Sequence, residues 1–144
     1  MSEADKIRNY LLMSLAPAEQ DDLYTRYWNP IEEFTKYDPS SFVRDYLTMK
    51  QGKIGRIDKI YFIFKEYAEA ANIDRATLLE DMHHYAKIYS QVDSATIGTD
   101  KLNRKLNQLR TLDSTIAYPF FMAFFDYAPK VGLAENEIYR VLDV

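Results

Sequence analysis

The amino-acid sequence predicts an all-α protein, a single compact domain of about seven or eight helices without a sheet. Residues that favour helix N-caps recur along the chain, two of them followed directly by proline, and apolar residues return every three or four positions. Signals for paired strands, such as two-residue hairpin turns, are missing. Apolar residues make up 47% of the 144 residues, which is enough for the core of one domain of this length.

Helix-start signals are dense in the first third of the chain. Ser2 and Asp5 have the spacing of a capping box, in which each side chain bonds the backbone N–H of the other residue. Proline is favoured in the first turn of a helix, so Pro17 marks the start of the next helix. Asn29 followed by Pro30 predicts an N-cap and a first-turn proline, and therefore a further short helix.

The middle of the chain contains both start and stop signals. Asp38 before Pro39 predicts another N-cap, and the helix that follows should end near Gly52, since glycine favours the left-handed backbone of a helix end. The next helix is expected to end at Asn72 for the same reason. Asp74 then predicts the N-cap of a long helix.

The last third of the chain continues the helical pattern. Thr99 predicts an N-cap ahead of leucines spaced by four and three residues, and the last two helices should lie near 119–128 and 135–142. Two short runs, 60–64 and 120–125, are apolar on every face and would also suit strands. Their helical neighbours favour helices, and apolar residues on all sides predict that both helices are central and fully buried.

The composition narrows the possible chemistry. The chain has no cysteine, which excludes disulfides, thiolate metal sites and a cysteine nucleophile. Its two histidines, at 83 and 84, are adjacent and would point about 100° apart on a helix, so they do not form a metal pair. No glycine-rich phosphate loop occurs. We therefore expect no cofactor, no metal and no enzymatic activity from this chain alone.

The sequence also bears on location. The N-terminus has two acidic residues before its first basic one and lacks the apolar core of a signal peptide. The uncharged stretch 114–125 would span about 18 Å as a helix, which is shorter than the ~30 Å apolar core of a bilayer. These features predict a cytoplasmic protein without a membrane segment.

Basic residues form two clusters despite a net charge of −4. Lysine and arginine side chains that gather in this way can contact nucleic-acid phosphates, although a solvated surface gives the same pattern. An acidic balance argues mildly against a dedicated nucleic-acid-binding domain. The candidate nucleic-acid-binding residues are Lys50, Lys53, Arg56 and Lys59 in the first cluster and Lys101, Arg104 and Lys105 in the second.

Several segments, in order along the chain, carry a family resemblance. They are Ala4 to Met13 (ADKIRNYLLM), Tyr27-Trp28, Phe42 to Leu47 (FVRDYL) with Lys50, Gly52, Lys53 and Ile54, Ile60 to Tyr67 (IYFIFKEY), Tyr85 to Tyr89 (YAKIY) and Pro119 to Phe121 (PFF). Their order and spacing resemble the helical region of GmrSD-type restriction proteins, the domain-of-unknown-function 262 family. Members of this family have a ParB/sulfiredoxin-like core with a D-G-Q-Q-R motif, and many carry a His-Asn-His nuclease domain.

The resemblance leaves out the parts that carry catalysis in that family. No Asp-Gly pair occurs in the chain, and neither histidine lies in a nuclease-like setting. The resemblance therefore implies a fragment of a larger multidomain protein, in which residues 1–144 form one helical domain. Its expected role is non-catalytic: it would pack against the ParB-like core or nuclease domain, of the same or a partner chain, and contact the DNA backbone.

Three residues are candidates for such a domain interface. Arg8 and Asn9 lie where the family's core would join this region, and Trp28 does not fit the core spacing of its neighbours. Aromatic residues are enriched at interfaces, so the same residues suit an alternative function, a free-standing helical module for protein–protein interaction. A small enzyme with an unrecognised site is a third hypothesis, disfavoured by the scarcity of histidine, cysteine and glycine motifs.

Overall fold

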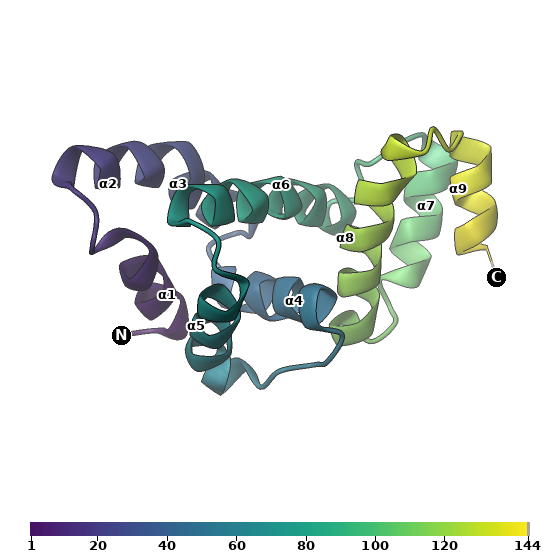
Figure 1. Cartoon of the computed structure of the whole chain (residues 1–144). Coiled ribbons are helices and arrows are strands. Elements are labelled where there is room, and N and C mark those ends of the chain that lie inside the picture. Colours follow the sequence, from purple (N-terminus) through teal and green to yellow (C-terminus); the bar gives the residue numbers. More distant parts are fainter. Residues whose placement is uncertain (144) are drawn as a thin grey trace.

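The computed structural model describes residues 1–143, and every regular element within them is helical, which confirms the all-α fold class (Figure 1). The α-helices are α1 (Glu3–Leu12), α2 (Pro17–Leu23), α3 (Asn29–Phe34), α4 (Pro39–Gln51), α5 (Ile60–Ala71), α6 (Arg75–Asp93), α7 (Asp100–Leu109), α8 (Ser114–Lys130) and α9 (Glu135–Leu142). A π-helical turn (Tyr24–Trp28) and a short 3₁₀ turn (Ile57–Lys59) complete the described elements.

The π-helical turn joins α2 to α3 without a break, so the nine α-helices of residues 1–143 form eight continuous helical bodies, in line with the predicted number. The predicted N-cap at Asn29 is wrong. Its backbone is helical (φ −60°, ψ −46°), and its N–H donates to the carbonyl of Tyr24. Pro30 explains the wide turn, because in an ordinary α-helix its ring would clash with the carbonyl four residues earlier. A π-helical turn before the proline lets the helix continue.

Most of the other predicted helix ends are confirmed. The capping box at the start of α1 is present, with hydrogen bonds of 3.0 and 3.1 Å. Asp38 and Asp74 cap α4 and α6 through hydrogen bonds to backbone N–H groups. Gly52 and Asn72 end α4 and α5 in the left-handed conformation, with φ of 76° and 53°. Local signals of this kind need only a few neighbouring residues, so the sequence predicts them well.

Two helix starts differ from the prediction. Thr99 lies at the N-cap position of α7, but its side chain forms no capping bond; its backbone N–H donates instead to the carboxylate of Glu135. The helix predicted near 119–128 begins earlier, at Ser114, where Asp113 caps it. Pro119 therefore lies inside α8 rather than at its start. A proline is tolerated there at the loss of one backbone hydrogen bond.

Helices α4 and α6 lie across the middle of the molecule, and α8 packs against both (Figure 1). At one end α3 packs on α6 and α1 packs on α5. At the other end α7 and α9 pack against each other beyond α8. The arrangement makes α8 the link between the central pair and the two last helices.

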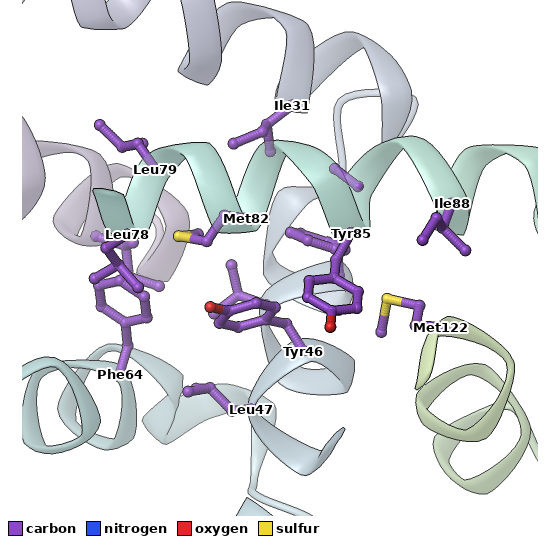
Figure 2. Packing of buried hydrophobic residues seen from close by; sticks show 14 of the residues in the cluster. Ile31, Tyr46, Leu47, Phe64, Leu78, Leu79, Met82, Tyr85, Ile88 and Met122 are labelled. Carbon is purple, nitrogen blue, oxygen red and sulfur yellow. The ribbon is translucent and has the colours of Figure 1, made fainter. Parts of the chain in front are cut away.

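The core forms around α6, which is apolar on opposite faces because helices cover it on both (Figure 2). One face meets Ile31 of α3, and the other meets Tyr46 of α4, Phe64 of α5 and Met122 of α8. The buried residues that α6 contributes are Leu78, Leu79, Met82, Tyr85, Ala86, Ile88 and Val92. Burial of these side chains from several helices at once makes one continuous core.

The expectation that the two all-apolar runs are fully buried is wrong. Both runs are helical, but Phe62 of α5 is 59% exposed and Phe120 of α8 is 49% exposed. Their neighbours Phe64 and Phe121 are buried, so each helix packs one face and presents an apolar face to solvent. Within residues 1–143, no helix has both the length and the apolar character needed to cross a membrane.

Candidate functional site

The most distinctive surface feature is an apolar groove of about 490 Å³ at the far end of the molecule. It forms where α7 ends, α8 begins and α9 ends. Its lining residues are Leu109 and Leu112 from α7 and the loop after it, Asp113 at the N-cap of α8, Ile116, Ala117, Phe120 and Phe121 from the first half of α8, and Val141 and Leu142 from the end of α9. We call this surface the α8 groove.

The floor and the rim of the α8 groove differ in burial. Ala117, Phe121 and Leu142 form the floor and belong to the core, whereas Ile116 is 63% exposed and Phe120 is half-exposed on the rim. Large apolar side chains rarely group on the surface unless something covers them. The sequence does not predict this site, because an all-apolar helix does not reveal which of its faces the rest of the fold leaves open.

Asp113 is the one charged residue among those that line the α8 groove. Its Oδ1 accepts hydrogen bonds from the backbone N–H and the hydroxyl of Thr115, at 3.0 and 2.7 Å. Those two bonds lower the pKa of the Asp113 carboxyl. The positive charge of Arg44 lowers this pKa further. The carboxylate is therefore ionised at neutral pH and marks one end of an otherwise apolar surface.

Three of the four residues in the first basic cluster come together around a separate hollow. Lys53, Arg56 and Lys59 line a depression of about 320 Å³ in the loop between α4 and α5. Arg56 is held by Asp58 through two contacts of 3.1 and 2.7 Å, and Glu66 also lines the hollow. Lys53 and Lys59 form no ion pair with any other residue in 1–143, so they carry the positive charge of this surface.

Lys50 does not join that hollow. Its ammonium lies 3.0 Å from the Asp81 carboxylate and 5.5 and 5.0 Å from the ring centres of Tyr46 and Tyr85. The hydroxyl of Tyr46 donates to the same carboxylate at 2.6 Å. Lys50 is thus held between two aromatic rings and an acid, which makes it a structural cation rather than a free phosphate ligand.

The polar contacts around Lys50 continue to α8 through Tyr85. Its hydroxyl donates to Asp126 at 2.9 Å, and Lys130 and the ring of His84 also contact that carboxylate, at 3.0 and 2.7 Å. Burial alone would raise the pKa of Asp126, but these three hydrogen bonds hold it below the usual value. The contacts tie α6 to α8, a connection that sequence spacing did not predict.

The second basic cluster is also largely engaged. Lys105 contacts Asp143 at 2.6 Å, and the ammonium of Lys101 lies 4.2 Å from the ring centre of Tyr139 on α9. Arg104 is exposed and forms no ion pair within the described chain. The hollow beside Lys101 shares no residue with the one around Lys53, so the two clusters line separate hollows.

The candidate interface residues lie at the opposite end of the molecule from the α8 groove (Figure 1). Arg8 and Asn9 are partly exposed on α1, where Arg8 contacts Asp5 at 3.4 Å. Trp28 is only 2% exposed, so its assignment to an interface is wrong in this structure. Trp28 belongs to the core cluster, and the π-helical turn that carries it packs on α6, which the spacing of its neighbours does not reveal.

The two histidines diverge as the helix geometry predicts. His83 packs against the rings of Tyr27 and Phe34, and burial lowers the pKa of its imidazole, with smaller contributions from Lys87 and His84. The ring of His84 is exposed and points to α8 instead. Among residues 1–143, no three histidine, aspartate or glutamate side chains gather closely enough to hold a metal ion.

Comparison of the chain with models of protein families, with curated proteins and with solved structures finds no match.

Proposed function

We propose that this chain is a non-catalytic helical docking region of a GmrSD-type DNA-targeting protein, in which it packs against a ParB-like core or a nuclease domain. The α8 groove carries the proposal. It is apolar, open to solvent and larger than a single side chain, and exposed apolar surfaces of this kind mark contacts between folded domains. Restriction and phage defence in the cytoplasm belong to the same proposal, through the family resemblance.

The segment with the densest resemblance supports a structural role. In Phe42 to Leu47, the residues Phe42, Asp45, Tyr46 and Leu47 are all buried, and Lys50 just after them is held between tyrosine rings. Packing therefore accounts for Phe42, Tyr46 and Leu47 without a catalytic purpose.

Binding to an isolated ParB-like core tests the proposal. Purified chain is mixed with the ParB-like core domain of a GmrSD-type protein, and association is measured by isothermal titration calorimetry. Ile116→Glu or Phe120→Glu places a charge in the α8 groove and should weaken association by about tenfold or more. Phe62→Glu is the matched control, because the exposure of Phe62 lies between those of Phe120 and Ile116 but Phe62 lies on α5. Its affinity should be unchanged.

Absence of binding in this measurement would contradict the proposal. If the chain binds neither a ParB-like core nor a nuclease domain of the family, the GmrSD-type role is dropped. If it instead binds an unrelated protein through the α8 groove, and salt hardly changes the affinity, the free-standing interaction module becomes the better hypothesis. Circular dichroism of each variant checks that the fold is retained.

A second candidate function, weak contact with the DNA backbone, rests on the convergence of Lys53, Arg56 and Lys59 around one hollow. Each phosphate contact releases counterions, so affinity should fall with salt. The double variant Lys53→Ala/Arg56→Ala should lower both the affinity and its salt dependence, whereas Lys87→Ala on α6 should change neither. Unchanged binding of the double variant to duplex DNA would remove this function from the loop.

A further inference from the structure

We infer that the α8 groove binds one amphipathic helix of the partner, with an apolar face against α8 and a lysine or arginine beside Asp113. The inference rests on the proposed function, because it names the occupant of the same surface. Three features of the groove support it: the spacing of its apolar residues, the walls that α7 and α9 provide, and the position of its single charge.

The spacing of the lining residues suits a helix. Along α8 they are Asp113 at its N-cap and residues 116, 117, 120 and 121 within it, which recur at intervals of three and four and follow one face for about 12 Å. Helices pack on each other through such rows of side chains, with axes about 8–10 Å apart. A peptide that binds by adding a strand would instead need the free edge of a sheet, and no strand occurs within residues 1–143.

The walls of the groove define where the helix lies. Leu109 at the end of α7 and Val141 at the end of α9 flank the lining residues of α8. An added helix would therefore complete the packing of these three helices. The lining offers a small polar ligand a single charged group, whereas an amphipathic helix can place several apolar residues along it. Helix-in-groove recognition depends on such repeated apolar anchors.

Asp113 sets the charge of the partner. One of its oxygens, Oδ1, bonds Thr115, and the other forms no hydrogen bond within residues 1–143. The carboxylate stands at the start of α8, at one end of the apolar stripe. A cation on the partner helix would pair with it, whereas a phosphate would be repelled. The same charge therefore disfavours nucleic acid in this groove.

A synthetic peptide tests the inference directly. The probe is a fluorescein-labelled amphipathic peptide of about 16 residues, with leucines at i, i+4, i+7 and i+11 and one lysine beside the first leucine. Fluorescence anisotropy with the full chain should show saturable binding that a scrambled peptide lacks. Ile116→Glu or Phe120→Glu should weaken binding by about tenfold or more, and Phe62→Glu should not.

The role of Asp113 has its own test. Asp113→Asn should weaken binding of the lysine peptide by about three- to fivefold, since the pair is partly exposed, and should not change binding of the same peptide with glutamine in place of lysine. Asparagine retains the helix cap, so the fold is preserved. If Asp113→Asn weakens binding of both peptides equally, the carboxylate does not pair with the charge of the partner.

Three results would overturn the inference: no peptide binding, equal binding of the scrambled peptide, or a dimer of the chain that Ile116→Glu dissociates in analytical ultracentrifugation. The last result would mean that a second copy covers the groove. Binding of a ParB-like core through the α8 groove without peptide binding would leave the proposed function intact and exclude a helical occupant. Peptide binding without domain binding would support a helical occupant and contradict the proposed function.

Discussion

Asp45 is the residue whose environment differs most from that of an ordinary carboxylate. It is 1% exposed, and its Oδ2 has no hydrogen-bond partner within the described chain. Burial raises the pKa of its carboxyl to about 6, against the attraction of Arg44, whose Nε lies 3.4 Å from the other oxygen. A buried charge with only one partner is costly, so the fold holds Asp45 more easily when it is protonated.

The pH dependence of stability should reflect this residue. The folded-state pKa lies above the unfolded value near 3.8, so the folded chain binds more protons between these values. The contribution of Asp45 to the free energy of unfolding is therefore fully present below about pH 4, and this contribution is lost as pH rises through about 6. Two pKa units correspond to at most about 3 kcal/mol. Urea unfolding between pH 4 and 7 measures the change.

Asp45→Asn should raise the free energy of unfolding at pH 7 by about 1–3 kcal/mol, because it removes the buried charge and keeps the shape. It should also reduce the change in the free energy of unfolding between pH 4 and 7. Asp21→Asn, at an exposed position on α2, is the control and should leave both unchanged. A variant of Asp45 that is less stable at pH 7 would mean that the Arg44 contact outweighs burial.

Tyr46 offers a second test at the residue scale. Its hydroxyl bonds Asp81, and burial raises its pKa, with that hydrogen bond contributing further, so it remains a donor at every ordinary pH. Tyr46→Phe should lower the free energy of unfolding by about 1–2 kcal/mol, measured in urea. Tyr61→Phe is the control, since the Tyr61 hydroxyl forms no hydrogen bond within residues 1–143. An equal loss of unfolding free energy in both variants would show that the Tyr46–Asp81 hydrogen bond is not the cause.

At the scale of single elements, the sequence predicts helix ends well when they depend on near neighbours. Gly52 and Asn72 end their helices as expected because a left-handed backbone is a local requirement. The start of α8 and the continuous run through Pro30 were not predicted, since both depend on how a proline is accommodated inside a helix. Proline alone does not say whether a helix begins or continues.

The caps themselves can be compared directly. Asp74→Ala removes the hydrogen bonds that cap α6 and should lower the free energy of unfolding by about 1 kcal/mol, whereas Asp74→Asn should cost a few tenths. Thr99→Ala at the start of α7 is the matched control, because that side chain forms no capping bond. Thermal or urea unfolding measures all three. Similar losses at both positions would show that the bonds are not the cause.

At the scale of the whole molecule, the sequence identified charged residues more readily than the surfaces they form. Lys53, Arg56 and Lys59 do meet, because they are close in the chain. Lys50 and Trp28 do not lie where their neighbours suggested, since each is placed by helices distant in sequence. The α8 groove could not be predicted at all, because it depends on which side of α8 the other helices leave uncovered.

The purified chain should leave DNA and nucleoside triphosphates intact in the presence of magnesium or manganese. Phosphodiester cleavage needs an activated nucleophile and stabilisation of the developing charge, which is supplied in many enzymes by a metal between converging ligands. His83 packs among aromatic rings and His84 points elsewhere. Gel assays and phosphate release measure the outcome. Turnover that disappears with His83→Ala or Glu80→Gln would place an active site within these helices.

The π-helical turn before Pro30 also bears on how chains of this fold can vary in length. A π turn holds one residue more per turn than an α-helix, so it is a point where a helix can accommodate one extra residue without breaking. Removing Thr25, which is exposed, together with Pro30→Ala would restore an ordinary α-helix while Leu23 and Ile31 keep their places in the core. Chains that share this architecture can therefore be one residue shorter here, and an alignment should allow a gap inside this helix.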